Sequence, residues 1–490
     1  MSKWTKNLIS VLLCTVLILP LAATSYAGNT KAPSPAYFDL PVKLQKVKVG
    51  ISFEETSVRS AYFQNVVGNG FSFGYFDYSR CFHEFAGLDE VEICLRPDTG
   101  YTYSDEDAGE EKSVGAWHVL LNGEYEDFST TLKKSAGYID GAPAYLDGKF
   151  RIVCGSFDTE ENALSAVSER ALNAEAYSGG EAVLICTVPD SDELMFMTDR
   201  SLALRPVCDE KAETYYGGNV YYGDFELKAT DAGLTVINYV GIEDYVKGVL
   251  PYEMIASWPP EALKAQGICA RTYLTHYVNV YGELGFDLRN DVFSQVYKGK
   301  TGTVTESNEA AEATSGQYLR YRGAPCKVYY MSSDGGATDS SANVFSQRRA
   351  YLSGRIDTNE DELDFYNKTW TAVLMEETVV RRLNSYGCEL DSVKSIEASE
   401  SDYGIVKQLD ITDRNGKTIT LLGEDCFLAL GLYSSNYKVE SLDEDLWSFD
   451  GRGWGHNCGM SQWGAYSMAK YGESKCDDIL EYYFSGAYIR

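Results

Sequence analysis

The chain of 490 residues is 44% hydrophobic and 23% charged, which predicts two or three globular domains and excludes a largely disordered chain. Its 43 basic and 72 acidic residues give a formal charge of −29, which disfavours binding to nucleic acid and nonspecific adhesion to anionic lipid or wall polymers. Attachment to a polysaccharide would then need shaped sites; 37 tyrosines and 7 tryptophans offer aromatic faces, although strand packing accounts for most of the tyrosines.

The N-terminal residues have the layout of a secretory signal peptide. Lys3 and Lys6 precede an apolar run over residues 8–23, and residues 25–27 (S-Y-A) form a small-residue cleavage pattern. Cleavage there would begin the mature chain at Gly28. The apolar run is also near the shortest length that spans a membrane, so an uncleaved anchor is the alternative. Both interpretations predict that the body of the protein lies outside the cytoplasm, with membrane contact only if the segment is retained.

The twelve cysteines are scattered and include no C-x-x-C pair. Their mostly apolar surroundings favour buried core thiols over a metal cluster. Loss of Cys14 with the signal peptide would leave an odd number, so at least one thiol would stay unpaired if disulfides form, and the sequence assigns no pairs.

Residues 28–110 are predicted to form a β-rich N-terminal segment. Short apolar runs at 46–51, 71–76 and 90–95 alternate with clusters of glycine, asparagine and aspartate, as is typical of short strands separated by turns. Nothing in this segment points to chemistry.

Residues 111–200 contain a strand followed by a helix, twice. The apolar stretch 117–121 leads to a helix over 127–134, and 150–157 leads to a helix over 158–172. We expect Asp158 to cap the second helix, with Glu161 completing a capping box. Its buried face is expected to comprise Ala163, Leu164, Val167 and Ala171.

The second of these strand-helix stretches, F-R-I-V-C-G-S-F-D-T-E-E-N-A at 150–163, resembles a SPOR domain. The resemblance implies an α+β module that binds peptidoglycan strands lacking stem peptides. The alternative is an unrelated α+β spacer with the same alternation of strand and helix.

Residues 201–490 are predicted to form a mixed α+β domain around one notable carboxylate. Glu253 follows two strands and a short helical or turn connection, and it is expected in an apolar turn between Pro251 and Trp258. Desolvation there would raise the pKa of its carboxyl toward neutrality, so that it could act as a general acid. Pro260 then opens a largely buried helix, in which Arg271 needs a carboxylate or a ligand as its partner.

Two local signals lie further along the chain. The segment D-R-N-G at 413–416, between apolar stretches 405–411 and 417–422, predicts a β-hairpin. Residues 375–385 have the apolar spacing of an amphipathic helix, to which we assign no function.

Four motifs follow one another in the second half of the chain: V-L-P-Y-E-M-I-A-S-W-P-P-E-A-L-K-A-Q-G-I-C-A-R-T-Y-L at 249–274, D-V-F-S-Q-V-Y-K-G at 291–299, S-S-D-G-G at 332–336, and G-R-G-W-G-H-N-C-G-M-S-Q-W-G-A-Y at 451–466. In this order they resemble the stage II sporulation protein D and LytB amidase-enhancer (SpoIID/LytB) family. The resemblance extends from about residue 215 to the C-terminus.

The resemblance implies a lytic transglycosylase that acts on denuded peptidoglycan strands. Ordinary glycoside hydrolysis needs two carboxylates, and only Glu253 stands out here. The family reaction needs one: Glu253, at the matching position of P-x-E-M, would protonate the glycosidic oxygen and then accept the proton of the sugar's C6 hydroxyl as a 1,6-anhydro ring closes. The alternative for Glu253 is a structural carboxylate that pairs with Arg271 or Lys264.

The resemblance also implies substrate-binding residues, whose polar side chains and glycine turns would hold sugar hydroxyl and acetamido groups: Arg271, Gln295, Tyr297, Ser333, Gly335, Gly336, His456, Ser461 and Gln462. His456 is equally well explained as a structural histidine, so we assign it to binding rather than to catalysis. The glycines of 451–464 lack the order of a phosphate-binding loop.

No metal or other cofactor is expected. Some relatives carry C-D-x-x-H-C before Q-V-Y and bind zinc there, whereas residues 289–294 of this chain read R-N-D-V-F-S and offer neither thiolate nor imidazole. Met331, where relatives often have histidine, and Asn457-Cys458, where they have Gly-Val, are further departures. The loss of histidine at 331 is expected to weaken activity.

The sequence therefore predicts a multidomain α+β protein with a signal peptide (1–27), a β-rich segment (28–110), a SPOR-like module (111–200) and a SpoIID/LytB-type domain (201–490). Our first functional hypothesis is a secreted lytic transglycosylase of peptidoglycan strands, with a role in sporulation as one option. The alternative is a noncatalytic glycan-binding activator of an N-acetylmuramoyl-L-alanine amidase, and a third option is a structural component of wall assembly.

Overall fold

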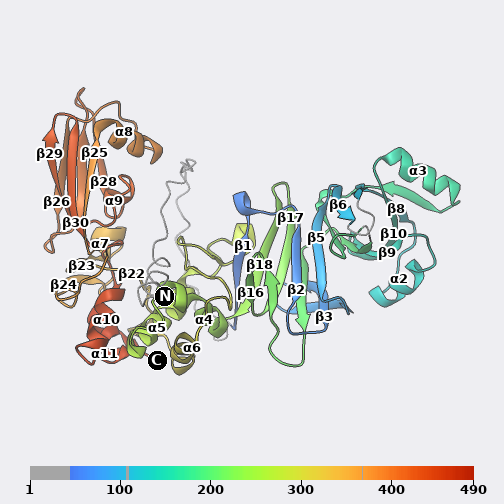
Figure 1. Ribbon diagram of the computed structural model, residues 1–490, viewed down its shortest axis with the longest axis horizontal. Coiled ribbons are helices and arrows are strands. Elements are labelled where there is room, and N and C mark those ends of the chain that lie inside the picture. Colours follow the sequence, from blue (N-terminus) through green and yellow to red (C-terminus); the bar gives the residue numbers. More distant parts are fainter. Residues whose placement is uncertain (1–44, 106–109, 192, 367) are drawn as a thin grey trace, which may run out of the picture. The chain divides into compact units, whose positions relative to one another are not determined.

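The computed structural model describes residues 45–105, 110–191, 193–366 and 368–490 (Figure 1). The predicted signal peptide lies outside these residues. The described chain forms two compact units: a larger unit of residues 45–327 with 489 and 490, and a smaller unit of residues 328–488. No helix of the described chain is long and apolar enough to cross a membrane.

The first sheet of the larger unit has seven strands in the order β19-β1-β18-β17-β14-β3-β4. Their bounds are β1 Lys46–Ser52, β3 Gly70–Phe76, β4 Phe82–Leu88, β14 Leu202–Val207, β17 Asp224–Thr230, β18 Gly233–Gly241 and β19 Leu288–Arg289. All neighbours are antiparallel except β1 and β19. Strands from the first hundred residues therefore pair with strands from beyond residue 200.

The second sheet has ten strands in the order β11-β8-β10-β9-β13-β12-β5-β2-β15-β16. Their bounds are β2 Ala61–Asn65, β5 Glu92–Asp98, β8 Trp117–Leu121, β9 Gly141–Leu146, β10 Lys149–Phe157, β11 Ala174–Tyr177, β12 Gly180–Thr187, β13 Leu194–Thr198, β15 Thr214–Tyr216 and β16 Asn219–Tyr221. The hairpin of β6 (Tyr101–Asp105) and β7 (Glu110–Val114) forms its own two-stranded sheet. The domain boundaries predicted from the sequence at residues 110 and 200 therefore do not separate one sheet from the other.

One end of the ten-stranded sheet is a β-α-β-β-α-β unit. Helix α2 (Phe128–Ser135) follows β8, helix α3 (Glu160–Glu169) follows β10, and the four strands lie in the antiparallel order β11-β8-β10-β9 (Figure 1). This is the split β-α-β arrangement. The predicted double alternation of strand and helix is confirmed.

Two details of helix α3 differ from the prediction. Thr159, not Asp158, is the cap: its side-chain oxygen accepts a hydrogen bond from the Asn162 N–H at 3.2 Å. Ala163 and Ala166 pack against β8 and β10, whereas Leu164 is 46% exposed. Helix α3 begins one residue later than predicted, which explains why Thr159 and not Asp158 is the cap. A capping prediction therefore depends on the exact helix boundary.

Helices α4 (Ile242–Glu253), α5 (Pro260–Tyr277) and α6 (Thr305–Ala313) pack against one another after β18 (Figure 1). The predicted helix start at Pro260 is confirmed, and most of α5 is buried. The prediction of a turn around Glu253 is wrong, because α4 continues through Pro251 and ends at Glu253 itself. The unit also contains the 3-10 helices η1 (Glu54–Thr56) and η2 (Gly282–Leu284) and the pair β20 (Leu319–Tyr321) and β21 (Ala324–Pro325).

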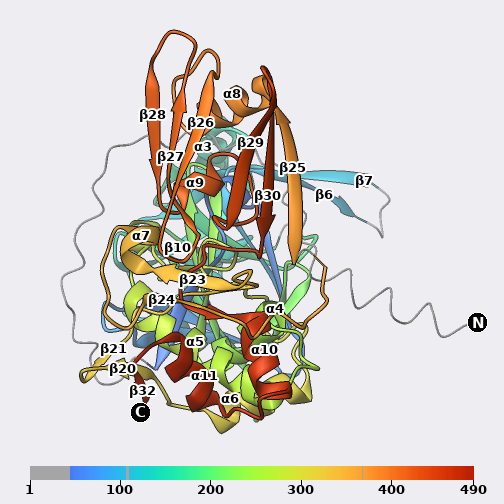
Figure 2. The same ribbon diagram turned by 90° about the vertical axis from the view of Figure 1, so that its left-hand side faces the viewer.

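The smaller unit contains two three-stranded antiparallel sheets, β25-β30-β29 and β26-β27-β28, with helices α8 and α9 (Figure 2). Their bounds are β25 Thr369–Met375, β26 Ser395–Glu400, β27 Val406–Thr412, β28 Thr418–Leu422, β29 Tyr437–Asp443, β30 Leu446–Arg452, α8 Glu376–Ser385 and α9 Asp425–Leu428. Residues of both sheets and of both helices share one apolar core. The predicted hairpin at 413–416 and the predicted helix at 375–385 are both confirmed.

The rest of the smaller unit consists of short elements. Strand β22 (Tyr330–Met331) lies parallel to β31 (Met460–Ser461), and β23 (Ala337–Ser340) is antiparallel to β24 (Ser353–Ile356). Helices α7 (Ser341–Phe345), α10 (Gln462–Lys470) and α11 (Cys476–Tyr483) complete the smaller unit. Strand β32 (Tyr488–Ile489) follows them, at the point where the chain passes back to the larger unit. With helices, antiparallel sheets and two units, the protein has the predicted multidomain α+β architecture.

Candidate functional site

Glu253 presents a half-buried carboxylate at the C-terminal end of α4. Its Oε1 accepts a hydrogen bond from the Val296 N–H at 3.1 Å. The carbonyl end of a helix disfavours a negative charge, whereas a hydrogen bond from an N–H favours it. The carboxyl group is therefore positioned by the backbone, and two opposing influences act on its charge.

Residues 295–297, which include the Val296 N–H that binds Glu253, are supported by buried tyrosine side chains. The Tyr245 hydroxyl donates to Gln295 Oε1 at 3.1 Å, and the Tyr245 and Tyr297 rings stack with centroids 5.0 Å apart. Burial, and secondarily the negative charge of Glu253, raises the pKa of Tyr245 well above its usual value, so this hydroxyl stays a donor. The Tyr297 hydroxyl donates to Asn238 Oδ1 at 2.8 Å. Tyr297 is thus a buried support beneath Val296.

Arg271, which the sequence indicated needed a partner, forms an ion pair with Glu243. The distances are 3.0 Å from Nε to Oε1 and 2.6 Å from Nη2 to Oε2, and the guanidinium also donates to the carbonyls of Gly267, Ala311 and Gln317. The Arg271 side chain is fully buried, while that of Glu243 is 38% exposed. These contacts hold the α4, α5 and α6 region together, and sequence reasoning missed Glu243 as the partner.

In the smaller unit a second carboxylate, Glu360, joins two of the predicted motifs. The Ser333 hydroxyl donates to Glu360 Oε2 at 2.5 Å, the Asp334 N–H donates to Oε1 at 3.2 Å, and the Ser461 hydroxyl also donates to Oε1. Both serines are buried, as is Glu360. Sequence reasoning missed Glu360; the acidic run in which it lies, T-N-E-D-E-L-D, was the available signal.

Glu360 interacts with two further buried carboxylates, Asp334 and Asp357. The Tyr483 hydroxyl donates to Asp357 Oδ2 at 2.6 Å. Burial, followed by the charges of Glu360 and Asp357, raises the pKa of Asp334 well above its usual value. Burial also raises the pKa of Glu360, against the opposing effect of the two serine hydrogen bonds. The three carboxyl groups therefore favour a state in which at least one of them is protonated over a state in which all three are negatively charged.

The glycines of the two smaller-unit motifs allow their backbones to touch. Ser333 and Trp454 exchange backbone hydrogen bonds at 3.2 and 2.8 Å. Gly335 has φ +68°, and a Cβ added to it would lie 2.6 Å from the carbonyl carbon of Arg452. Gly336 has φ +106°. Gly335 is therefore required for both conformation and close approach, and Gly336 for conformation.

His456 has the surroundings of a neutral, structural histidine. Its Nδ1 accepts from the Cys458 N–H at 3.1 Å, and its ring lies edge-on to Tyr329 and Phe345. Burial lowers its pKa to about 4. Gln462 is buried at the start of α10, next to Ser461, whose hydroxyl accepts from the Gly464 N–H.

The predicted site residues thus form two groups. Glu253, Arg271, Gln295 and Tyr297 lie in the larger unit, and Ser333, Gly335, Gly336, His456, Ser461 and Gln462 lie in the smaller unit. Within the larger group the structure brings Glu253 and the segment 295–297 together; within the smaller group it joins Ser333 and Ser461 through Glu360. Arg271 belongs to a separate ion pair.

The zinc ligands of some relatives have no counterpart in residues 289–294, where Arg289 and Asp291 instead form an ion pair at 2.7 Å. Across the described residues, no cluster of three or more histidine, cysteine, aspartate or glutamate side chains has metal-binding geometry. Residues 289–294 therefore do not offer the ligands that a zinc ion needs.

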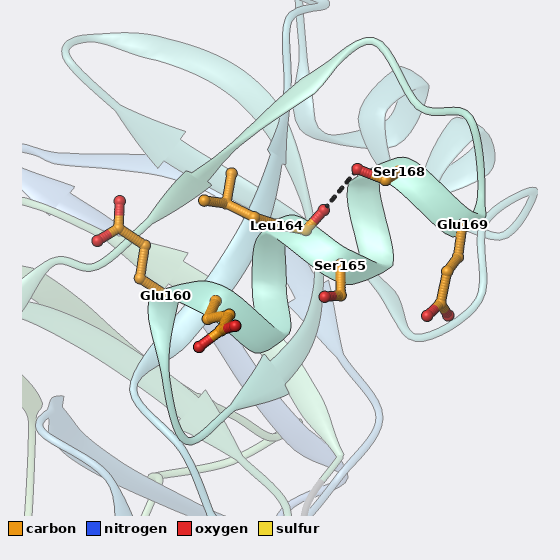
Figure 3. A pocket seen from close by; sticks show the side chains of 6 residues that line it. Glu160, Leu164, Ser165, Ser168 and Glu169 are labelled. Carbon is orange, nitrogen blue, oxygen red and sulfur yellow. Dashed lines mark hydrogen bonds between the residues drawn. The ribbon is translucent and has the colours of Figure 1, made fainter.

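A pocket on the outer surface of α3 has a lining different from that of the predicted site (Figure 3). It is lined by exposed acidic and small polar side chains and by Leu164, and the Ser168 hydroxyl donates to the Leu164 carbonyl at 3.1 Å. None of the predicted site residues lines it.

Comparison with known proteins identifies the family. The family model described as stage II sporulation protein (SpoIID) matches residues 230–321, which include Glu253, Arg271, Gln295 and Tyr297. An uncharacterised protein of Brachyspira hyodysenteriae is 33% identical over 280 residues, covering 56% of this chain and 73% of that protein. Stage II sporulation protein D of Bacillus subtilis is 30% identical over 287 residues, covering 54% and 80%.

A third relative is the amidase enhancer of Bacillus subtilis, 27% identical over 297 residues, which cover 49% of this chain and 39% of that protein. Together these relationships define the class: the chain belongs to the SpoIID/LytB family. The predicted family resemblance is confirmed.

Proposed function

We propose that this protein is a secreted lytic transglycosylase that cleaves peptidoglycan strands lacking stem peptides. The observation that carries the proposal is the setting of Glu253: a half-buried carboxylate, held by the Val296 N–H, inside the region that matches the family model. The name of the sporulation relative supports a role in sporulation.

The reaction needs one carboxyl group in two protonation states. Protonated Glu253 gives its proton to the glycosidic oxygen, and the bond to the C1 carbon of the sugar breaks. The resulting carboxylate then accepts the proton of the C6 hydroxyl as that oxygen bonds to C1 and closes a 1,6-anhydro ring. Glu253 ends protonated, no water is consumed, and no metal or other cofactor takes part.

The structure suits Glu253 to both steps. The Val296 N–H keeps one oxygen of the carboxyl group in place, and the side chain is only half-buried, so a substrate can reach it. Gln295, held by Tyr245, and Val296 belong to the same segment, so the buried tyrosines set the position of the carboxylate's partner. We assign Arg271 and Tyr297 to supporting this geometry. In the smaller unit, Ser333, Ser461 and His456 support the backbone of the glycine-rich motifs, and the substrate-binding role proposed for these motifs falls to Gly335, Gly336 and Gln462.

The second candidate function is noncatalytic: a glycan-binding activator of an N-acetylmuramoyl-L-alanine amidase. The similarity to the amidase enhancer of Bacillus subtilis favours it. In this case the same polar groups would bind the strand, while a partner enzyme would cut the wall.

One experiment separates the two functions. Purified glycan strands without stem peptides are incubated with the mature protein or with Glu253→Gln, and the products are analysed by mass spectrometry. The amide oxygen of glutamine still accepts from Val296 N–H, so the variant keeps the local geometry. Anhydro-muramyl ends formed by the mature protein alone support the transglycosylase; strand binding without products from either protein supports the activator.

A further inference from the structure

The loop of residues 289–294, between β19 and Gln295, has an exposed apolar tip. Phe293 is 72% exposed and Val292 is 69% exposed, although both lie in a loop of the folded larger unit. Single exposed apolar side chains are ordinary on protein surfaces. Two adjacent ones next to the segment that binds the Glu253 carboxylate call for an explanation.

The loop is held rigidly by its own polar groups. The Arg289 guanidinium donates to both oxygens of Asp291, at 3.2 Å from Nε to Oδ1 and 2.7 Å from Nη2 to Oδ2. Asp291 Oδ1 also accepts from the Phe293 N–H at 3.0 Å, and the Ser294 hydroxyl accepts from the Arg289 N–H at 3.2 Å. The exposed tip is thus presented by a fixed backbone.

Arg289 also holds the Phe293 ring from one side. Its guanidinium lies 4.9 Å from the Phe293 ring centroid and 4.8 Å from that of Phe53. Cation–π contacts of this kind limit the motion of an exposed ring. Because Asp291 already neutralises Arg289, the loop offers a ligand an apolar face with no unpaired charge of its own.

The position of the tip suggests its ligand. Phe293 is three residues before Val296, so their Cα atoms lie at most about 11 Å apart, and Val296 N–H binds Glu253. A polymer bound at Glu253 is therefore long enough to reach Phe293. Sugar rings have apolar C–H faces that pack on aromatic rings, and the neutral loop favours such a ligand over a charged one.

We propose that Phe293, with Val292, is a carbohydrate-stacking platform that binds a sugar ring of the strand held at Glu253. The identity of the ligand rests on the proposed function, but the platform needs only binding of the strand, not its cleavage. Phe293 is therefore a binding residue that selects strands with an accessible sugar face.

The test measures the affinity of the mature chain for stripped glycan strands by calorimetry, with Glu253→Gln present throughout so that strands are not consumed. Phe293→Ala is compared with Phe293→Tyr, which keeps the aromatic face. Tyr78→Ala is the matched control, because Tyr78 is a fully exposed aromatic residue in the turn between β3 and β4. Thermal melting curves check that each variant is folded.

We expect Phe293→Ala to weaken strand binding about tenfold, from the lost burial of the ring, and Phe293→Tyr and Tyr78→Ala to change it less than about twofold. Unchanged affinity in Phe293→Ala overturns the proposal, as does the absence of strand binding by the Glu253→Gln parent. A variant that binds strands normally but no longer binds an amidase also overturns it, since the tip would then be a protein-docking surface. Binding without anhydro products from the wild type refutes the transglycosylase and leaves the platform standing.

Discussion

Two carboxylates, one in each unit, lie in contrasting surroundings. Glu253 in the larger unit is half-buried and is positioned by a backbone N–H, whereas Glu360 in the smaller unit is buried and receives hydrogen bonds from Ser333 and Ser461. A carboxyl group that must give and take a proton has to reach its substrate, while one that joins two backbone segments does not. The contrast supports the proposed proton transfer at Glu253 and a scaffolding role for Glu360.

The largest expected effect concerns Glu253. Glu253→Gln should lower the rate of anhydro-product formation at least about 100-fold, since a general acid contributes on this scale, while the melting temperature stays near that of the wild type. Product formation is measured by mass spectrometry of stripped strands. If Glu253→Gln retains full activity, the assignment of the proton transfer to this residue is wrong.

The next effect concerns the Arg271 and Glu243 ion pair. Glu243→Gln should lower the free energy of unfolding by roughly 3 kcal/mol, because it leaves the fully buried Arg271 cation without its paired charge. Arg271→Met should cost less, since the Glu243 carboxylate that it leaves is partly exposed to solvent. Urea unfolding followed by circular dichroism measures both, with the exposed Lys228→Met as control. Equal losses for the two variants would contradict this assignment.

A smaller effect is expected for the carboxyl cluster of the smaller unit. The pKa of Asp334 is raised in the folded state, so its protonated form stabilises the fold fully below about pH 3.9, the value in an unfolded chain, and this stabilisation is lost as the pH rises through the folded pKa. Asp334→Asn, which keeps an oxygen for the Gly336 N–H, should be more stable than the wild type at pH 7.5 by on the order of 1 kcal/mol.

Thermal melts of Asp334→Asn and the wild type between pH 4 and 8 measure this difference. The gap between the two proteins should widen toward high pH. If the gap is constant across the range, Asp334 does not hold a proton in the folded unit.

The smallest effect is expected at Tyr245. Tyr245→Phe removes one hydrogen-bond donor to Gln295 and leaves the ring stacked on Tyr297, so activity should fall only severalfold, the scale of about 1 kcal/mol. Steady-state rates on stripped strands measure the change. A loss as large as that of Glu253→Gln would show that Tyr245 takes part in the chemistry directly.

The sequence predicted those parts of the fold that depend on neighbouring residues. The helix start at Pro260, the hairpin at 413–416 and the helix at 376–385 each carry a local signal, and all three are confirmed. The turn around Glu253 was predicted wrongly, because the short helical or turn connection expected before it is helix α4, which extends through Pro251 to Glu253.

The parts that the sequence did not predict depend on residues far apart in the chain. Arg271 was expected to need a partner, but Glu243 lies 28 positions away, and Glu360 lies 101 positions from Ser461. Likewise, β1 pairs with β18, nearly 200 residues later, so the segment 28–110 did not reveal its sheet partners. Such contacts are fixed by tertiary packing and leave no periodic pattern in the sequence.

The central claim, that Glu253 closes an anhydro ring on the sugar without using water, is tested most directly in water enriched in oxygen-18. Stripped glycan strands are cut by the mature protein in this solvent, and the new ends are analysed by mass spectrometry. The account predicts anhydro-muramyl ends that contain no solvent oxygen and that are absent with Glu253→Gln. Reducing ends labelled with oxygen-18 would contradict it, because they would show that water, not the C6 hydroxyl, attacks the sugar.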